Sequence, residues 1–127
     1  MATGMSVTLR NEILDAVFNN GSYAVAVPWI SLHTDDPGAN GANEATGGSY
    51  ARQNASAAFA AAGSGACTND VAVSFTGMPA VTVKYIGVWD DETAGNWLWG
   101  GALAANKTTN AGDTFQLPIG DIDASLT

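Results

Sequence analysis

The sequence predicts a mainly β domain, an antiparallel β-sandwich or small barrel-like fold of six to eight short strands with one short N-terminal helix. Three observations lead to this prediction. Apolar and polar residues alternate in several short segments, turn-forming residues separate these segments at intervals of roughly ten residues, and one stretch alone has helical periodicity. The 127 residues suffice for a single domain, with residues 1–20 as an N-terminal arm and helix and residues 28–127 as the β-sandwich.

The helix is predicted over residues 9–18, where apolar residues recur at the spacing of a single helical face. Ser6 or Thr8 can cap its first turn, because both side chains can accept a hydrogen bond from a free backbone N–H. Gly21 can end the helix by taking the left-handed backbone conformation that closes many helices. The strands therefore follow a short amphipathic helix.

Five apolar side chains form the apolar face of this helix. They are Leu9, Ile13, Leu14, Val17 and Phe18. A face of this kind either covers one end of a sheet or docks on a neighbouring subunit, and the sequence leaves both roles open. We take these five residues as the candidate partner-docking site.

After the helix, the chain reads as short β segments bounded by turn residues. Strands are expected over residues 28–34, 49–59, 71–75, 81–89, 97–103, 113–120 and 121–126. The segment 81–89 becomes apolar on both faces and is the expected central strand. It is expected to pair with 97–103 in a hairpin across an acidic loop, whereas residues 60–70 form a flexible loop inside the domain.

Alternation within three of these segments assigns the residues that face the core. The expected inward residues are Val71, Val73 and Phe75 in one segment, Trp97, Trp99 and Leu103 in another, and Phe115, Leu117 and Ile119 in a third. Pro118 limits the third segment to an edge or a strand end, because proline cannot donate to a sheet.

The charge of the chain is sparse and strongly acidic. Charged residues make up 13%, and twelve acidic residues against four basic ones give a formal net charge of −8. This balance argues against nucleic acid as a partner, since phosphate binding needs clustered lysine and arginine. No membrane partner is expected either, because no apolar run approaches the ~18 residues of a membrane span.

Cysteine usage indicates the compartment of folding. Cys67 is the only cysteine, so the chain has neither an intrachain disulfide nor a cluster of thiolates for zinc. The N-terminus lacks the charged start and apolar stretch of a secretory signal. We therefore expect the protein to fold and assemble in a cytoplasm.

The segment "SLHTDDPGANGANEATGGSYARQ" holds the densest group of possible metal ligands. Asp36, Asn40 and Gly41 match positions 1, 5 and 6 of an EF-hand calcium loop. Glycines stand at two further ligand positions, so the match to an EF-hand fails and no metal is assigned. A calcium site built from Asp35 or Asp36 together with the acidic loop 90–92 remains open.

Catalytic groups are scarce. His33 is the only histidine, and a histidine at a strand end between Leu32 and Thr34 is more often a hydrogen-bonded packing residue than a catalytic base. Adjacent acids point in opposite directions in an extended chain, and no nucleophile or nucleotide-binding motif is present. We therefore expect no enzymatic activity and no cofactor.

The remaining candidates for binding are aromatic. Trp89, Trp97 and Trp99 would form a platform for a carbohydrate or a partner if they were exposed. The core is favoured instead, because Trp97 and Trp99 alternate in register with Leu103, and Trp89 closes the most apolar strand.

Several of these phrases occur together in a known kind of protein. In order, they are "ISLHTDDPGANGANEATGGSYARQ", "VAVSFTGMPAVTVKYIGVWDDETAGNWLWGGAL" and "KTTNAGDTFQLPIGDIDASL". From about Trp29 to the C-terminus, the chain resembles a family of small structural proteins of tailed bacteriophages, especially those of actinobacteria. These proteins are variously called minor capsid, capsid decoration or minor tail proteins. The resemblance implies a β-sandwich without enzymatic activity.

What the resemblance implies about function is a structural role in the virion, after assembly in the bacterial host cytoplasm. The expected role is a capsid decoration protein that binds the outer surface of the shell and stabilises it. Its expected partners are the major capsid protein and copies of itself in a homo-oligomer. A minor tail or tail-fibre module that contacts a host surface receptor is the main alternative, and a cell-wall hydrolase domain is a remote one.

Overall fold

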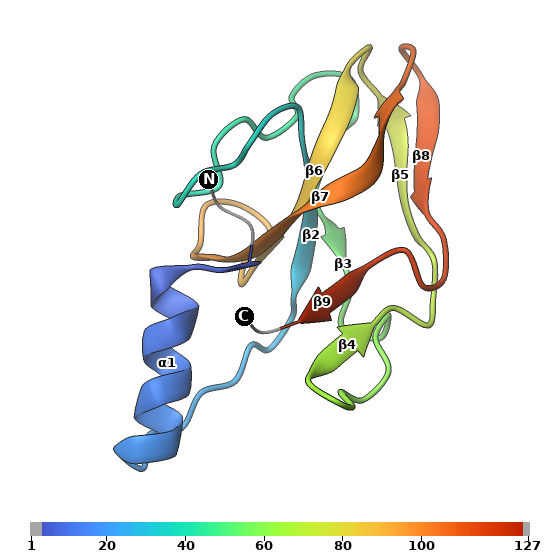
Figure 1. The fold of residues 1–127 in the computed structure, drawn as a ribbon. Helices are drawn as coiled ribbons and strands as arrows, with labels where there is room; N and C mark the ends of the chain where they lie inside the picture. Colours follow the sequence, from blue (N-terminus) through green and yellow to red (C-terminus); the bar gives the residue numbers. More distant parts are fainter. Residues whose placement is uncertain (1–3, 126–127) are drawn as a thin grey trace.

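The computed structural model describes residues 4–125, and its fold is the mainly β architecture that the sequence predicted (Figure 1). An antiparallel sheet of five strands has the order β1-β7-β6-β2-β3, while β5 pairs with β8 and β4 with β9. The elements are β1 (Gly4–Met5), α1 (Val7–Phe18), β2 (Trp29–His33), β3 (Gln53–Asn54), β4 (Ala66–Thr68), β5 (Val73–Met78), β6 (Thr82–Trp89), β7 (Trp97–Thr108), β8 (Asp113–Leu117) and β9 (Asp123–Ser125).

The main core lies between the five-stranded sheet and the β5–β8 pair. Ile30 and Leu32 of β2 project into it from one side and are fully buried. Phe75 of β5 and Phe115 of β8 close it from the other, with ring centroids 6.2 Å apart in an edge-to-face arrangement. Two sheets packed over one apolar layer make a β-sandwich, as expected.

The predicted hairpin and central strand are confirmed. The strand expected over 28–34 is β2, and the one expected over 81–89 is β6, which lies in the middle of the five-stranded sheet. β6 pairs with β7 in an antiparallel hairpin, although β7 continues to Thr108, well past the predicted end. A strand needs apolar residues on both faces where both faces of its sheet are covered, as they are here, which is why this segment stood out.

Two segment predictions were wrong. Of the strand expected over 49–59, only Gln53–Asn54 forms a strand, because the chain turns directly afterwards: the Asn54 side chain accepts a hydrogen bond from the Ser56 N–H. The loop expected over 60–70 contains β4, which pairs with β9. A strand of three residues that pairs with the distant end of the chain leaves no periodic signal in the sequence.

Two inward assignments were also wrong. Val71 is 50% exposed and Ile119 is 67% exposed, because both lie just outside their strands. The side chain of Asn69 fixes both turns, since its Nδ2 donates to the backbone oxygens of Val71 and Pro118. The buried residues expected beside them, Val73, Phe75, Phe115 and Leu117, do form the core.

Trp97, Trp99 and Leu103 were expected to share one face of their strand. A register shift between β6 and β7 shows that this expectation is wrong. Val88 pairs with Trp99 but Trp89 pairs with Trp97, so one extra residue of β7 is accommodated between them. Successive residues of β6 face opposite sides, so Trp99 joins the main core whereas Trp97 lies on the other face of the sheet. Both faces of this sheet are therefore occupied.

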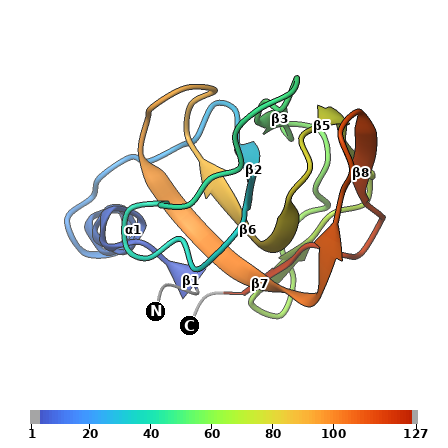
Figure 2. The ribbon, with the colours of Figure 1, turned by 90° about the horizontal axis from the view of Figure 1, so that it is seen from above.

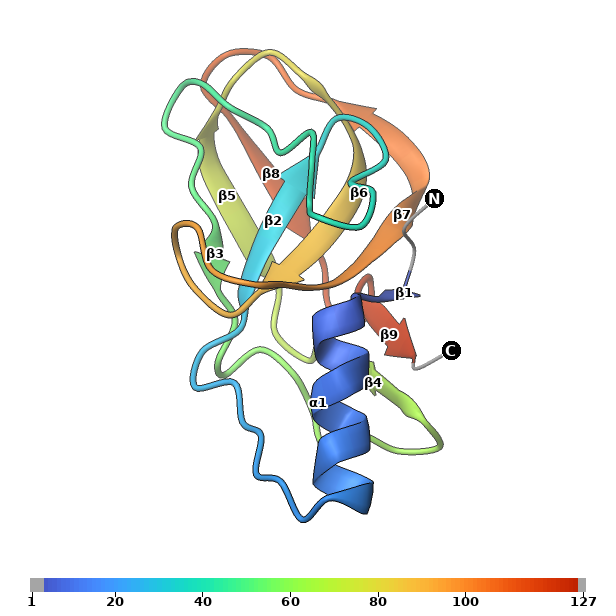
Figure 3. The same cartoon turned by 90° about the vertical axis from the view of Figure 1, so that its left-hand side faces the viewer.

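The second face is covered by the segment between β2 and β3, which crosses in front of β2 and β6 in Figure 3. Ser31, His33, Trp89 and Trp97 lie beneath this segment and are all buried. The glycine-rich segment between β2 and β3, which the sequence analysis considered as a calcium loop, is therefore a lid over this second face of the sheet.

The helix begins two residues earlier than predicted. Ser6 is its N-cap, and its Oγ accepts a hydrogen bond from the Leu9 N–H at 3.0 Å. Asn20, and not Gly21, takes the left-handed conformation after the helix, with φ of 54°. Asparagine tolerates this region better than most residues with a side chain. Within residues 4–125, no helix is long and apolar enough to cross a membrane.

Candidate functional site

Helix α1 projects from the body of the domain. Figures 1 and 3 show its first turn next to β1 and its last turn pointing away from the five-stranded sheet. Figure 2, which looks along the helix, shows it on the side of the molecule opposite β5 and β8. None of its twelve residues is buried, and none belongs to the main core.

The apolar face predicted for partner docking is largely open to solvent. Leu14 is 52% exposed, Val17 67% and Phe18 76%, whereas Leu9 and Ile13 are partly covered. Large apolar side chains with this exposure on one helix are uncommon unless another surface covers them. Docking itself stays a prediction.

A small apolar groove lies on this face, where the helix meets β1. It has a volume of about 240 Å³ and is lined by Met5 of β1 and by Arg10, Ile13 and Leu14 of α1. Three of these residues are spaced i, i+3 and i+4 along the helix, which is the arrangement that receives one side chain of a packed partner helix.

The base of the helix is fixed to the sheet. Ser6 is 7% exposed, and its N–H donates to the Leu98 oxygen of β7 at 2.7 Å. Met5 pairs with Trp99 in the same β7. The helix is therefore held at its N-terminal end, and all of its residues from Leu14 onward are exposed.

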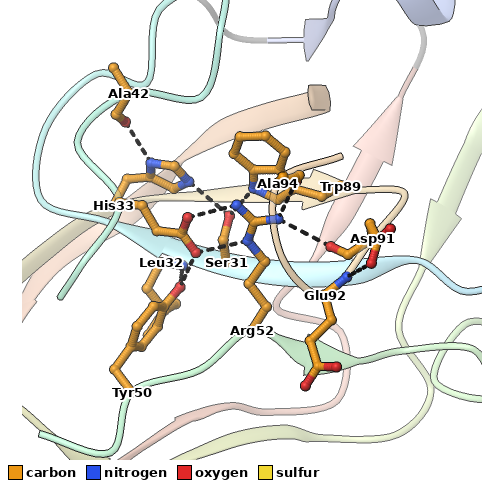
Figure 4. A network of polar contacts seen from close by, with 11 residues as sticks. Ser31, Leu32, His33, Ala42, Tyr50, Arg52, Trp89, Asp91, Glu92 and Ala94 are labelled. Carbon is orange, nitrogen blue, oxygen red and sulfur yellow. Dashed lines mark hydrogen bonds and ion pairs between the residues drawn. The ribbon is translucent and has the colours of Figure 1, made fainter. Parts of the chain in front are cut away.

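A second cluster, shown in Figure 4, joins the segments that carried the resemblance. The guanidinium of Arg52 donates to both carboxylate oxygens of Glu44 at 2.9 Å. Its Nη1 donates to the backbone oxygens of Asp91 and Ala94 at 3.1 and 2.8 Å. Its Cζ lies 3.8 Å from the centroid of a Trp89 ring. These contacts lock the loop after β6 to the lid over the sheet.

Tyr50 extends this cluster to the edge of β2. Its hydroxyl donates to Glu44 at 2.9 Å and accepts from the Leu32 N–H at 3.0 Å. Burial, with the Glu44 carboxylate as a further cause, raises the pKa of this hydroxyl. Tyr50 therefore stays neutral and serves as a hydrogen-bonding bridge.

His33 is fully buried and hydrogen-bonded at both ring nitrogens. Nδ1 donates to the Ala42 oxygen at 2.7 Å, since a carbonyl can only accept, and Nε2 therefore accepts from the Ser31 hydroxyl at 2.8 Å. That hydroxyl in turn accepts from Trp89 Nε1 at 3.0 Å. Burial lowers the pKa of His33, which agrees with a neutral ring. This is the packing role that the sequence favoured, and a Ser–His pair without exposed surface has no access to a substrate.

The aromatic platform is not available on the surface. Trp89 is 8% exposed and Trp97 6%, and their ring centroids lie 5.3 Å apart in an edge-to-face contact. A Cβ on Gly87 or Gly100 would overlap the Trp97 ring, so these two glycines provide the space in which it lies. Trp99 packs against the main core.

The acidic side chains of the two loops do not come together as a calcium site. No group of three or more histidine, cysteine or acidic side chains within residues 4–125 is arranged to hold a metal ion. The Asp35 carboxylate accepts from the Asp36 N–H, and the Asp90 carboxylate accepts from the backbone and side chain of Asn96. The carboxylates shape their own turns.

The sequence did not identify the cluster around Arg52. Residues 49–59 were expected to form a strand, which would have sent Tyr50 and Arg52 to the same face without a partner. The charges gave a signal for the Arg52–Glu44 ion pair, because Arg52 is one of only four basic residues and the acidic Glu44 precedes it by eight positions.

Comparison with known families identifies a family that matches nearly the whole chain. A family model described as "Podophage GP4 fiber I protein gp80", with the short name Gp80, matches residues 4–125. The match spans every helix and strand of the structure, α1 included. No curated protein matches the chain.

Proposed function

Because the chain belongs to the Gp80 family of podophage fibre proteins and is thus a phage structural protein, a component of the virion, we propose that it is a module of a tail fibre. The observation that carries this proposal is the match to a fibre-protein family over residues 4–125. In this role the β-sandwich is a rigid building block, and α1 attaches it to a neighbouring subunit of the fibre.

The distribution of polar and apolar groups supports a structural role. The groups with the chemistry of a catalyst, His33, Ser31 and Tyr50, are engaged in hydrogen bonds inside the fold. The exposed apolar side chains of α1, by contrast, lie outside the core that residues 4–125 form. A protein whose reactive groups are buried and whose apolar helix is exposed is suited to assembly.

A role in the tail fibre replaces capsid decoration as the function that we propose first. The capsid role was an expectation drawn from resemblance, whereas the family description names a fibre. The buried state of Trp89 and Trp97 also argues against a glycan platform made from these side chains. We therefore assign the module to the body of the fibre, with host contact left to other surfaces or subunits.

Localisation on the intact particle tests the proposal. Antibodies raised against the purified domain, labelled with gold, are expected to decorate the tail fibres of virions in electron micrographs. Labels distributed over the capsid shell would overturn the fibre assignment in favour of decoration. Pre-immune antibody, and antibody absorbed with the purified domain, serve as controls for non-specific labelling.

A further inference from the structure

We propose that the partner of α1 is the α1 helix of a second copy of the chain, packed antiparallel about a twofold axis that passes near Leu14. This inference deepens the proposed function, since it names the subunit that covers the exposed helix. It rests on the proposed function only for its biological setting, because the geometry of α1 does not depend on where the protein lies in the virion.

The face of α1 carries both a projecting side chain and a cavity to receive it. Val17 is 67% exposed, and the groove at Met5, Arg10, Ile13 and Leu14 is open. Val17 lies seven residues after Arg10, so the two share one side of the helix.

An antiparallel pair centred on Leu14 places these two features opposite each other. Position 17 of one helix then lies beside positions 10 to 13 of the other, so Val17 of each copy enters the groove of its partner. Leu14 meets its own counterpart at the axis, and Phe18 packs across it. An interface of this isologous kind is self-complementary and closes at two copies.

The direction of the helix favours the antiparallel arrangement. α1 is attached to the body at its N-terminal end, and its other end points away from the five-stranded sheet (Figures 1 and 3). Two antiparallel helices therefore place the two sheets at opposite ends of the pair. A parallel pair would bring the two bodies side by side.

Charge also favours this face. The chain has a formal net charge of −8, so most contacts between copies bring acidic surfaces together. On the apolar face of α1 the one charged side chain is the cationic Arg10, which lines the groove. Glu12 and Asp15 lie on other sides of the helix by their spacing from Leu14 and Val17.

The size of the interface sets its strength. A helix of twelve residues is about 18 Å long, and one such helix buries less than the ~800 Å² per partner of a stable complex. The isolated domain is therefore expected to dimerise weakly, at concentrations on the order of 100 μM. In a particle with many linked copies, weak contacts of this kind add up through their effective concentration.

Sedimentation of the purified chain provides the first test. The wild type is expected to show a reversible monomer–dimer equilibrium, and Val17→Asp is expected to weaken it at least tenfold. Ile119→Asp is the matched control, since Ile119 is also 67% exposed but lies away from α1, and it should leave the equilibrium unchanged. Equal weakening by both variants, or a wild type that stays monomeric up to millimolar concentration, would overturn the inference.

Crosslinking tests the position of the axis. In a Cys67→Ser background, Leu14→Cys is expected to form a disulfide-linked dimer at least tenfold faster than Val17→Cys. Residues at the axis meet their own counterparts, whereas the two copies of position 17 are about 9 Å apart along the helices, too far for a disulfide. Equal rates would contradict the proposed register. Gold labelling on virions is unaffected by either result, so the fibre assignment stands or fails separately.

Discussion

The guanidinium of Arg52 lies over the indole of Trp89, with Cζ 3.8 Å from the ring centroid. The two residues belong to segments far apart in the sequence, and their contact holds the lid over the second face of the sheet against the hairpin of β6 and β7. The cation is also paired with Glu44, and the Arg52 side chain is 9% exposed. Stacking, ion pairing and burial therefore coincide at one side chain.

Arg52→Ala is expected to lower the free energy of unfolding by about 3 kcal/mol, because it leaves Glu44 without its cation and removes the cover from Trp89. Urea denaturation followed by tryptophan fluorescence measures this change. Arg10→Ala, which removes a cation from an exposed position on α1, should alter stability by less than about 0.5 kcal/mol. A similar effect of both variants would show that the cluster adds no stability.

Gly87→Ala is expected to destabilise the fold by about 3 kcal/mol or to prevent folding. The new Cβ would overlap the Trp97 ring and lie 2.8 Å from Ser31 Oγ. Gly63→Ala is the control, because a Cβ there meets nothing within 4 Å and the backbone is not left-handed. Thermal unfolding by circular dichroism separates the two. Equal stability of the variants would mean that Trp97 does not lie against Gly87.

Stability is expected to fall as the pH drops below the ordinary pKa of histidine. Burial holds the pKa of His33 below 6.5 in the folded state, so the unfolded chain binds a proton that the folded chain does not. The free energy of unfolding then declines by up to about 1.4 kcal/mol per pH unit below pH 6.5, until the folded pKa is reached.

His33→Gln provides the comparison for this pH dependence. The variant is expected to be less stable at pH 7.5, where the wild-type contribution is complete, but to lose the decline between pH 6.5 and 5.5. Urea titrations at several pH values measure both slopes. Parallel slopes in the two proteins would assign the pH dependence to other groups.

Ser6→Ala is expected to destabilise α1 by about 1 kcal/mol, since its Oγ accepts from the Leu9 N–H. The effect should be local, because no residue of α1 is buried. Hydrogen exchange is expected to accelerate at the amides of the first helical turns while the protection of β6 stays unchanged. Thr8→Ala is the control, and equal acceleration by this variant would argue against Ser6 as the cap.

Local periodicity accounts for the parts of the fold that the sequence predicted. The segments 28–34 and 81–89, which the sequence marked as β segments bounded by turn residues, are strands that pair with neighbours over most of their length. The spacing in α1 and its capping serine are likewise properties of adjacent residues. Such signals depend only on which side of a strand or helix a residue occupies.

What the sequence by itself determined about this protein is its class, a β-sandwich with one amphipathic helix, while it left open whether the apolar face of that helix covers the sheet or docks on a neighbouring subunit. The tertiary structure alone decided that Trp97 and Trp99 face opposite sides, because one extra residue in β7 reverses the alternation. It also decided that Glu44, Tyr50 and Arg52 meet over β2 and that the glycine-rich stretch is a lid. These outcomes depend on contacts between distant segments, which no local pattern of residues encodes.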